Sequence, residues 1–363
     1  MVIILSKSSC SHTKKEIRGG SSMGVTIKQI AEMAGVHRST VDKVLHKRPG
    51  VSDSVRARVQ KIIDECGYEA NPIGKALQMQ DKELKIRVIL LEVDALEYLK
   101  KGIADAMKEY ASFHIAMEYV VTPYSEIAEQ AAELQKCRDE KLDGIILSPI
   151  NAPEIVEAID VCRHAGVPVI TINTDIKGSE RLCFIGQNGF KAGRIAGRLM
   201  GEFLRGQGEV AVFTSDGDEH QSFPFGTREG GFREIMEQNY PDMEILNSIQ
   251  TKEQTQIIRR EMRKLCEGEK MPDGIFITCG GVKAIGDVLQ EYEKQGVKVI
   301  CFESYPEIIE LMKEDVITAT LDSEIEEQGK QAVEVLMDYL VYGKKPERKH
   351  LYSEIRILLK ESL

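Results

Sequence analysis

The sequence lacks an apolar run that could cross a membrane. None of its stretches approaches the roughly eighteen consecutive apolar residues of a membrane-spanning helix. The apolar start, residues 1–5, is followed by Cys10, as in a lipoprotein signal, but it is far shorter than the core of a signal peptide and Lys7 lies on its wrong side. We therefore expect no membrane partner and a cytoplasmic location.

Motifs of the common enzyme classes are also missing. The sequence has no Walker loop, no glycine-rich dinucleotide fingerprint after its first predicted strand, no GxSxG and no HExxH. Its seven histidines are scattered, and the acidic stretch around His220 lacks the glycine-spaced ligand order of a calcium loop. We therefore predict no catalytic residue, no metal site and no cofactor.

The eight cysteines include no CxxC pair, and most of them fall in apolar helical or strand contexts. This usage is typical of reduced, buried thiols in a cytosolic protein.

Charge is unevenly distributed along the chain. The formal net charge is −10, yet residues 25–79 contain nine Lys and Arg against six Asp and Glu. Contacts to phosphates supply most non-specific DNA affinity, so a modestly basic segment on an acidic body suits a protein that binds DNA with one end.

Residues 25–45, VTIKQIAEMAGVHRSTVDKVL, have the pattern of two short amphipathic helices joined by a tight turn. Apolar residues repeat at helical spacing in both halves, Thr26 is placed as the N-cap of the first helix, and Gly35 ends it. A third helix is predicted from Ser52 onward. This spacing favours a helix-turn-helix, whose second helix docks in the major groove of DNA.

The second helix leaves a polar face that can contact bases and phosphates. We predict DNA contacts from Thr26, His37, Arg38, Ser39, Thr40, Lys43 and Lys47.

The run AEMAGVHRSTVDKVLHKRPGVSDSVRARVQKIIDECGYEAN resembles the headpiece of the LacI/GalR family of bacterial repressors. The resemblance implies a homodimer that binds a near-palindromic operator. His37 stands where the family usually has a capping Ser, Asp42 and Lys43 replace Ser-Arg, and Ala70 replaces Pro. These departures imply an operator sequence different from those of familiar members.

Residues 71–77 correspond to the hinge of that family, which orders on operator DNA and inserts a leucine into the minor groove. Leu77 would be that leucine. Pro72 suits the first helical position, whereas Gly74 costs about 1 kcal/mol relative to Ala and weakens the free helix. The alternative is an ordinary linker.

From residue 85 onward, short apolar runs alternate with helical stretches. This rhythm predicts parallel sheets covered on both faces, with ligands bound beyond the carboxyl ends of the strands. This part of the chain is too long to fold around a single hydrophobic core, which predicts two sheets. The predicted strands are residues 86–91, 115–121, 144–148, 168–172, 209–214, 244–249, 274–278, 297–302 and 316–321.

The segments DGIILSPINAPEIVEAIDVCRHAGVPVITINTD, FIGQNGFKAGRIAG, TREGGFREIM and VITATLDSEIEEQGKQA resemble the type I periplasmic sugar-binding proteins, whose fold LacI-type repressors use as an effector domain. The resemblance implies a cleft that closes on a small sugar or polyol. Carboxylates and Arg bind hydroxyls through charge-assisted hydrogen bonds. The positions that match the family's sugar contacts are Asn173, Asp175, Arg228, Glu303 and Ser323.

The sequence departs from that pattern at three places. The aromatic pair that stacks on the sugar is missing after the first strand, where the chain reads Val93-Asp94-Ala95-Leu96. Glu303 replaces the usual Asp, and Cys279 stands near the usual Asn. Phe223 is a candidate for a substitute apolar platform, or a simple loop anchor.

The predicted architecture is a small all-α helix-turn-helix headpiece followed by an α/β two-lobed domain of the periplasmic-binding-protein type. We predict a DNA-binding transcription regulator, a repressor controlled by a sugar or polyol, with a dimer as the default because no heptad tail follows the last strand. Two alternatives remain: the receptor of an ABC sugar importer, and a sugar-modifying enzyme of the same architecture. The predicted boundaries are an extension or mis-assigned start at residues 1–24, the headpiece at 25–70, the hinge at 71–84, and two lobes, the first about 85–187 plus 324–349 and the second about 188–323 plus 350–363.

Overall fold

The computed structural model describes residues 25–45, 48–66, 79, 82–215 and 225–363. The chain divides into two compact units, residues 1–74 and 75–363, so the boundary falls inside the predicted hinge. Predicted site residues Lys47, Leu77 and Phe223 lie outside the described residues, as do the extension at 1–24 and most of the hinge.

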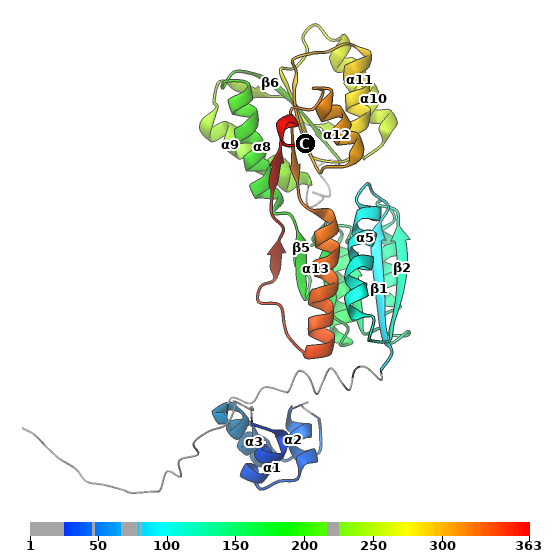
Figure 1. Cartoon of the computed structure of the whole chain (residues 1–363), viewed down its shortest axis with the longest axis vertical. Helices are drawn as coiled ribbons and strands as arrows, with labels where there is room; N and C mark the ends of the chain where they lie inside the picture. Colours follow the sequence, from blue (N-terminus) through cyan, green and yellow to red (C-terminus); the bar gives the residue numbers. More distant parts are fainter. Residues whose placement is uncertain (1–24, 46–47, 67–78, 80–81, 216–224) are drawn as a thin grey trace, which may run out of the picture. The chain divides into compact units, whose positions relative to one another are not determined.

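The first unit contains the three predicted helices around a small apolar core (Figure 1). Ile30, Val41 and Val59, one from each helix, are fully buried at its centre. The burial of these positions confirms the predicted apolar stripes. The helices are α1 (Ile27–Ala34), α2 (Arg38–Leu45) and α3 (Asp53–Cys66).

Local capping defines the turn between α1 and α2. Thr26 and Gln29 form a capping box, in which each side chain accepts a hydrogen bond from the other residue's backbone N–H. Gly35 ends α1 with φ of 62°, a left-handed conformation that glycine adopts without a Cβ penalty. The side chain of His37 then lies at the start of α2.

The second unit is built on two sheets. The first has the strand order β12-β5-β4-β3-β1-β2, and all its pairs are parallel. The second has the order β13-β11-β10-β9-β6-β7, with β8 beside β6 and with β13 antiparallel to β11. The strands are β1 (Leu84–Leu91), β2 (Ile115–Thr122), β3 (Gly144–Leu147), β4 (Val169–Ile172), β5 (Cys183–Gly186), β6 (Gly208–Thr214), β7 (Met243–Ile245), β8 (Ile249–Gln250), β9 (Gly274–Ile277), β10 (Lys298–Phe302), β11 (Ala319–Asp322), β12 (His350–Tyr352) and β13 (Arg356–Leu358).

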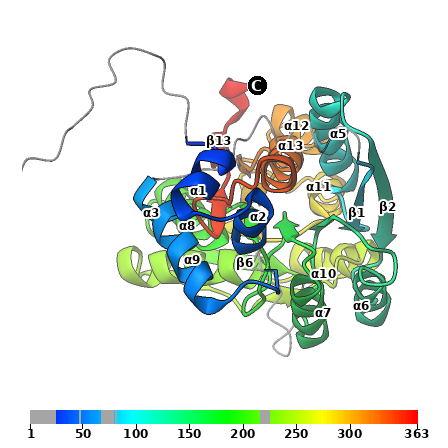
Figure 2. The ribbon, with the colours of Figure 1, turned by 90° about the horizontal axis from the view of Figure 1, so that it is seen from below.

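Helices cover both faces of each sheet, and α6 and α7 lie side by side on the first (Figure 2). In the described part of the chain, no helix is long and apolar enough to cross a membrane. The α-helices of this unit are α5 (Leu96–Met107), α6 (Ile127–Gln135), α7 (Pro153–His164), α8 (Gly189–Phe203), α9 (Phe225–Asn239), α10 (Thr255–Glu267), α11 (Val282–Glu291), α12 (Pro306–Lys313) and α13 (Ile325–Met337). Short helical turns are η1 (Lys108–Tyr110), η2 (Asp338–Tyr342) and η3 (Lys360–Ser362).

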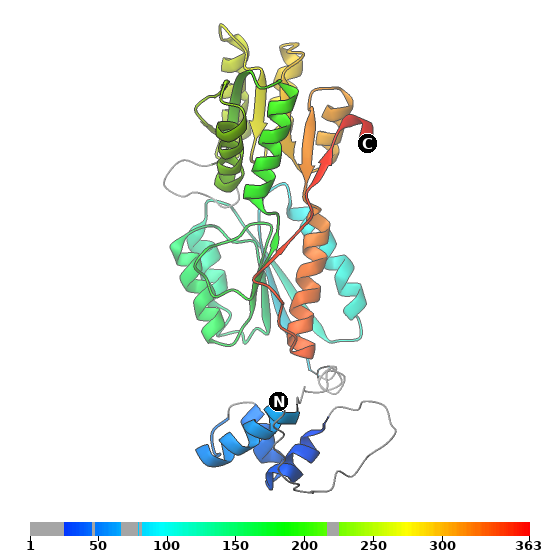
Figure 3. The same ribbon diagram turned by 90° about the vertical axis from the view of Figure 1, so that its left-hand side faces the viewer.

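The chain passes between the two sheets three times: after β5, after β11 and after β12 (Figure 3). The last passage corrects one predicted boundary, which assigned residues 350–363 to the second lobe. His350 and Tyr352 pair with β5 of the first sheet, and only β13 joins the second.

Eight of the nine predicted strands have a single counterpart, and the predicted strand at 244–249 is instead split into β7 and β8. β5, which had no counterpart among the predicted strands, has only four residues and no polar residue in its sequence CFIG. β12 and β13, of three residues each, also had no counterpart. Runs this short offer no periodicity, although the apolar composition of β3 and β4 was enough to predict those strands.

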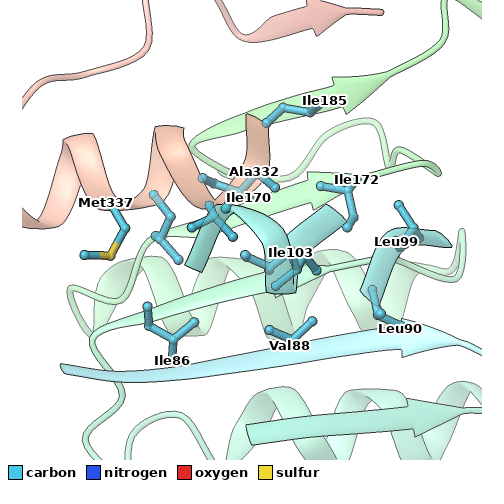
Figure 4. Packing of buried hydrophobic residues seen from close by; sticks show 14 of the residues in the cluster. Ile86, Val88, Leu90, Leu99, Ile103, Ile170, Ile172, Ile185, Ala332 and Met337 are labelled. Atoms are coloured by element: carbon cyan, nitrogen blue, oxygen red, sulfur yellow. The ribbon is translucent and has the colours of Figure 1, made fainter. Parts of the chain in front are cut away.

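Strand β1 illustrates why the sheets require apolar residues on both faces. Its residues Ile86, Val88 and Leu90 pack toward α5 and α13, as Figure 4 shows. Ile89 and Leu91 point to the other face and pack with α6 and α7. The side chains alternate with period two, so a central parallel strand needs apolar residues on both faces. Arg87 is the buried exception on β1, and its guanidinium is paired with Glu118 and Glu140.

Glycines on α8 allow α9 to pack closely against it. A Cβ atom on Gly193 would lie 1.8 Å from the backbone oxygen of Arg228, and one on Gly197 would lie 2.2 Å from a methyl group of Ile235. A side chain at either position is therefore incompatible with this helix pair unless the backbone moves.

All seven described cysteines are free thiols, and six of them are buried. Their burial agrees with the reading of these residues as small core side chains.

Candidate functional site

A cavity of about 490 Å³ lies at the carboxyl ends of strands from both sheets. Its volume is within the range of roughly 300–1,000 Å³ that is typical of small-molecule sites. The residues that line it follow β1, β2, β4, β8, β9 and β10, and include Asp94, Tyr124, Asn173, Arg228, Glu253, Cys279, Gly280, Glu303, Tyr305 and Glu307.

Arg228 on α9 is the buried cation of this cavity. Its guanidinium donates hydrogen bonds to Gln187 Oε1 at 3.0 Å, to the Thr278 carbonyl at 2.9 Å and to Glu303 Oε1 at 3.3 Å. It also stacks over the ring of Phe302, with 3.7 Å between the guanidinium carbon and the ring centroid. Burial lowers the pKa of Arg228, and Glu303 opposes that effect.

Glu303 follows β10 with φ of 69°, a left-handed conformation that is uncommon for a residue with a side chain. Its carboxylate accepts hydrogen bonds from the backbone N–H of Ser323 at 3.1 Å and from the Ser323 hydroxyl at 2.8 Å. Burial raises the pKa of Glu303, while Arg228 and Ser323 act in the opposite direction. Strained backbone of this kind is concentrated at binding sites.

Ser323, which was predicted to contact the ligand, lies behind Glu303 rather than among the residues that line the cavity. Gln328 in turn donates to the Ser323 hydroxyl oxygen at 3.0 Å. The structure therefore gives Ser323 the geometry of a positioning residue for the Glu303 carboxylate.

Asn173 follows β4 and lines the cavity opposite this network. Its φ of 62° places it, like Glu303, in the left-handed region. The neighbouring Thr174 also lines the cavity and is fixed by a hydrogen bond to the Pro149 carbonyl at 2.9 Å. Both sheets thus present a polar side chain from a left-handed turn at a strand end.

The structure does not bring Asp175 to the cavity. Its carboxylate is paired with the Arg181 guanidinium through two contacts of 2.5 Å, and both side chains are buried. The Thr171 hydroxyl donates a third hydrogen bond at 3.0 Å. Because its side chain turns toward Arg181, the expected contact between Asp175 and a ligand has no support in this geometry.

Cys279 lines the cavity after β9, as the sequence comparison with an Asn position suggested. Its thiol is buried, which raises its pKa, and it lies 3.7 Å from the Thr251 hydroxyl. A neutral thiol offers only weak hydrogen bonding.

Asp94, Tyr305 and Glu307 line the cavity but were not predicted as site residues. Tyr305, which directly precedes α12, stacks on Tyr98 of α5 with ring centroids 4.7 Å apart. A signal was available for Asp94, because it directly follows a predicted strand, as Asn173 and Glu303 do. In the sequence, however, Asp94 stands out only as part of the segment that replaces the aromatic pair.

On the headpiece, the predicted contact face of α2 is accessible. Arg38, Ser39 and Lys43 are exposed and Thr40 is half-buried. His37 differs, because its Nδ1 accepts a hydrogen bond from the backbone N–H of Ser39 at 3.3 Å. This contact caps the start of α2. His37 thus supplies a cap at the position where the family usually has a capping Ser, a role that was not predicted from the sequence. Its predicted contact with DNA stays a prediction.

Two family models match the chain. The periplasmic binding protein domain model matches residues 93–345, and the model of the bacterial regulatory proteins of the lacI family matches residues 26–71. The chain belongs to the periplasmic binding protein domain family and carries a lacI-type headpiece. The combination confirms the predicted two-part architecture.

Relatives of this lacI-type protein are transcription regulators. The PurR repressor of Edwardsiella ictaluri is 24% identical over 52% of this chain and 54% of its own length. The sucrose operon repressor of Streptococcus mutans is 23% identical over 70% of this chain and 74% of its own length. The PurR repressor of Klebsiella pneumoniae is 21% identical over 93% of this chain and 96% of its own length.

Solved structures agree with the fold of the second unit. A glucose-galactose binding protein from Geobacillus stearothermophilus has a TM-score of 0.69 and 24% identity, covering 78% of this chain and 99% of that chain. An ABC transporter solute binding protein from Burkholderia graminis, solved with D-arabinose, has a TM-score of 0.71 and 21% identity, covering 77% of this chain and 96% of that chain.

The headpiece separates the lacI-type regulator from these transport receptors. Of the two binding-protein functions that the sequence left open, regulation of transcription through DNA is the one supported by both units.

Proposed function

We propose that this lacI-type regulator is a cytoplasmic homodimeric repressor that binds a small sugar or polyol in the cavity beside Arg228. Binding would change the affinity of the headpieces for a near-palindromic operator, which couples two distinct sites. The coupling would pass through the segment that joins the two units. The cavity would bind its ligand without transforming it.

The observation that carries this proposal is the arrangement of Arg228, Glu303 and Asn173 around one cavity. A guanidinium has five N–H donors, and the described residues accept three from Arg228. The remaining donors, together with the Glu303 carboxylate and the Asn173 amide, suit vicinal hydroxyl groups.

A buried donor adjoins this arrangement. Gln187 accepts from Arg228 through Oε1, but its buried Nε2 has no hydrogen-bond partner among the described residues. Orphaned donors of this kind are uncommon in native proteins, and a bound molecule or water beside Arg228 would supply an acceptor.

The first experiment finds a ligand by thermal shift across sugars and polyols. Operator affinity is then measured with and without the best binder for wild type, Arg228→Ala and the control Arg233→Ala. Arg233 is on the same helix and is paired with Glu229, but it does not line the cavity. We expect Arg228→Ala to weaken ligand binding about 30-fold or more, because it leaves Glu303 buried without its cation.

Operator binding without ligand should survive in Arg228→Ala, and Arg233→Ala should respond as wild type does. If Arg228→Ala responds at wild-type ligand concentrations, the cavity is not the effector site.

A second experiment tests the DNA-binding face of α2. Arg38→Ala should relax discrimination between operator and mismatched sites, because Arg side chains read base edges. Lys43→Ala should weaken all sequences alike and lower the salt slope by about 1. Lys313→Ala, an equal charge change outside the headpiece, serves as the control. If Arg38→Ala instead weakens operator and mismatched sites equally, as Lys43→Ala should, Arg38 has no base-reading role.

A further inference from the structure

Carboxylates from both sheets converge on Gly280 in the cavity. A Cβ atom on Gly280 would lie 3.1 Å from Asp94 Oδ2 and 3.5 Å from Glu253 Oε1. Asp94 follows β1 of the first sheet, whereas Glu253 follows β8 of the second. Asp94 accepts a hydrogen bond from the backbone of Gly281, and Glu253 accepts one from the backbone of Gly280 at 3.2 Å.

The charged side chains that line the cavity are not balanced. Five are carboxylates and three are cations. Arg228 pairs with Glu303, whereas Arg259 and Lys283 both pair with Asp287.

Asp94 and Glu307 differ from the other acids. No Lys or Arg of the described chain lies within salt-bridge distance of either of them. The two acids belong to opposite sides of the cavity, because Asp94 follows β1 and Glu307 lies in the first turn of α12. Within the cavity their charges are incompletely screened by water.

Neighbouring groups respond to the same negative potential. Burial and then Glu307 raise the pKa of Asp94. Burial raises the pKa of Tyr98 and of Tyr305, and Asp94 adds to the increase at both. Asp94 thus lies near both rings of the Tyr98–Tyr305 stack, of which Tyr305 lines the cavity.

We propose that the effector carries a protonated amine that binds between Asp94 and Glu307, and that it is an amino sugar or an aminopolyol. This inference rests on the proposed function, because it takes the cavity as the effector site. The hydroxyl groups would face Arg228 and Glu303, while the ammonium group would face the two unpaired acids. An ammonium group donates three hydrogen bonds and offsets the repulsion between the acids.

An organic cation fits this place better than a metal ion. Among the described residues, no group of three or more His, Cys, Asp or Glu side chains is arranged to bind a metal. The ring of Tyr305, which stacks on Tyr98, lines the cavity with the two acids and provides an apolar surface for carbon atoms. The cavity volume of about 490 Å³ also leaves room for a ring or short chain beside the cation.

The test compares amines with neutral congeners of the same skeleton. Affinity of the full-length protein is measured by calorimetry for glucosamine against glucose, galactosamine against galactose, and 1-amino-1-deoxysorbitol against sorbitol. We expect the amine of at least one pair to bind about tenfold or more tightly than its congener, because hydrogen bonds to charged groups are stronger than neutral ones. High salt should reduce that preference.

The variants Asp94→Asn and Glu307→Gln test whether the amine binds between these two acids. Both keep an acceptor in place, so the Asp94 contact to Gly281 can persist. Each should reduce the affinity for the amine about tenfold and leave the neutral congener unchanged. The control Glu310→Gln, one turn further along α12 and exposed, should change neither.

The outcomes separate the two proposals. If neutral congeners bind as tightly as amines, or if Asp94→Asn weakens both equally, the amine assignment is overturned while the cavity remains the effector site. If no probe binds and Arg228→Ala has no effect on operator control, the proposed function fails as well.

Discussion

Two buried arginine–carboxylate pairs, one at the carboxyl edge of each sheet, have different surroundings. At the first sheet, Arg181 donates two hydrogen bonds of 2.5 Å to Asp175, and neither side chain lines the cavity. At the second sheet, Arg228 reaches Glu303 through a single contact of 3.3 Å, and both line it.

The difference lies in how much hydrogen-bonding capacity each pair has left. The Asp175 carboxylate already accepts two bonds from Arg181 and one from Thr171. Arg228 retains donors that face a cavity. A buried ion pair thus serves the fold when its partners satisfy each other, and is available to a ligand when they do not.

The largest expected effect concerns stability. Asp175→Ala should lower the free energy of unfolding by about 3–5 kcal/mol, because it leaves the Arg181 charge buried without a carboxylate. Urea unfolding of the full-length protein measures the loss. The control Asp315→Ala removes the exposed pair with Lys360 and should cost less than about 1 kcal/mol. If Asp175→Ala costs no more stability than the control, the Arg181–Asp175 pair does not have the structural role that distinguishes it here from the Arg228–Glu303 pair.

The next prediction tests whether Ser323 acts through Glu303. Ser323→Ala removes a hydroxyl that donates to the carboxylate at 2.8 Å. We expect about tenfold weaker binding of the best thermal-shift ligand, since hydrogen bonds to charged groups contribute about 1.5–3 kcal/mol. Calorimetry measures the affinity, and its pH profile should shift because Glu303 loses a donor to its charged form. Ser304→Ala, whose hydroxyl bonds Asp322 instead, should leave both unchanged.

The smallest effect is a pH dependence of stability. Burial raises the pKa of Glu303 above its usual 4.5, so the folded state binds this proton more tightly than the unfolded state. Stability from this group is therefore present at low pH and declines as the pH rises from 4.5 through the folded pKa. The difference in unfolding free energy between wild type and Glu303→Gln should fall by roughly 1.4 kcal/mol per pH unit in that window. A flat difference would contradict the raised pKa.

Much of the fold could be predicted from the sequence because it depends on periodic apolar residues. The stripes of α1 to α3 and the runs of β1 to β4 identify their elements without knowledge of partners. The predicted strands lack β5, β12 and β13 and do not show the split between β7 and β8. Runs of two to four residues show no period, and β3 and β4, which are as short as β5, were predicted from their apolar composition alone. The assignment of residues 350–352 failed because strand pairing is a long-range choice.

The site was harder to predict for a related reason. Polar residues after strands mark the cavity edge, and Asn173, Arg228, Cys279 and Glu303 do line it. A carboxylate is available to a ligand only if no arginine pairs with it in the fold. The six-residue separation of Asp175 and Arg181 in the sequence does not reveal that these two side chains pair. Glu307 lies on a helix, where an acidic first turn has an ordinary explanation as well.

The glycines of α8 have a consequence for how this family can diversify. Gly193 does not line the cavity, yet its missing side chain is what permits the backbone of Arg228 to lie where it does. In a saturation mutagenesis library selected for effector response, position 193 should tolerate as few substitutions as position 228. New ligand specificities should therefore arise by exchange of cavity-lining side chains such as Asp94 and Cys279, while the α8–α9 pair stays invariant.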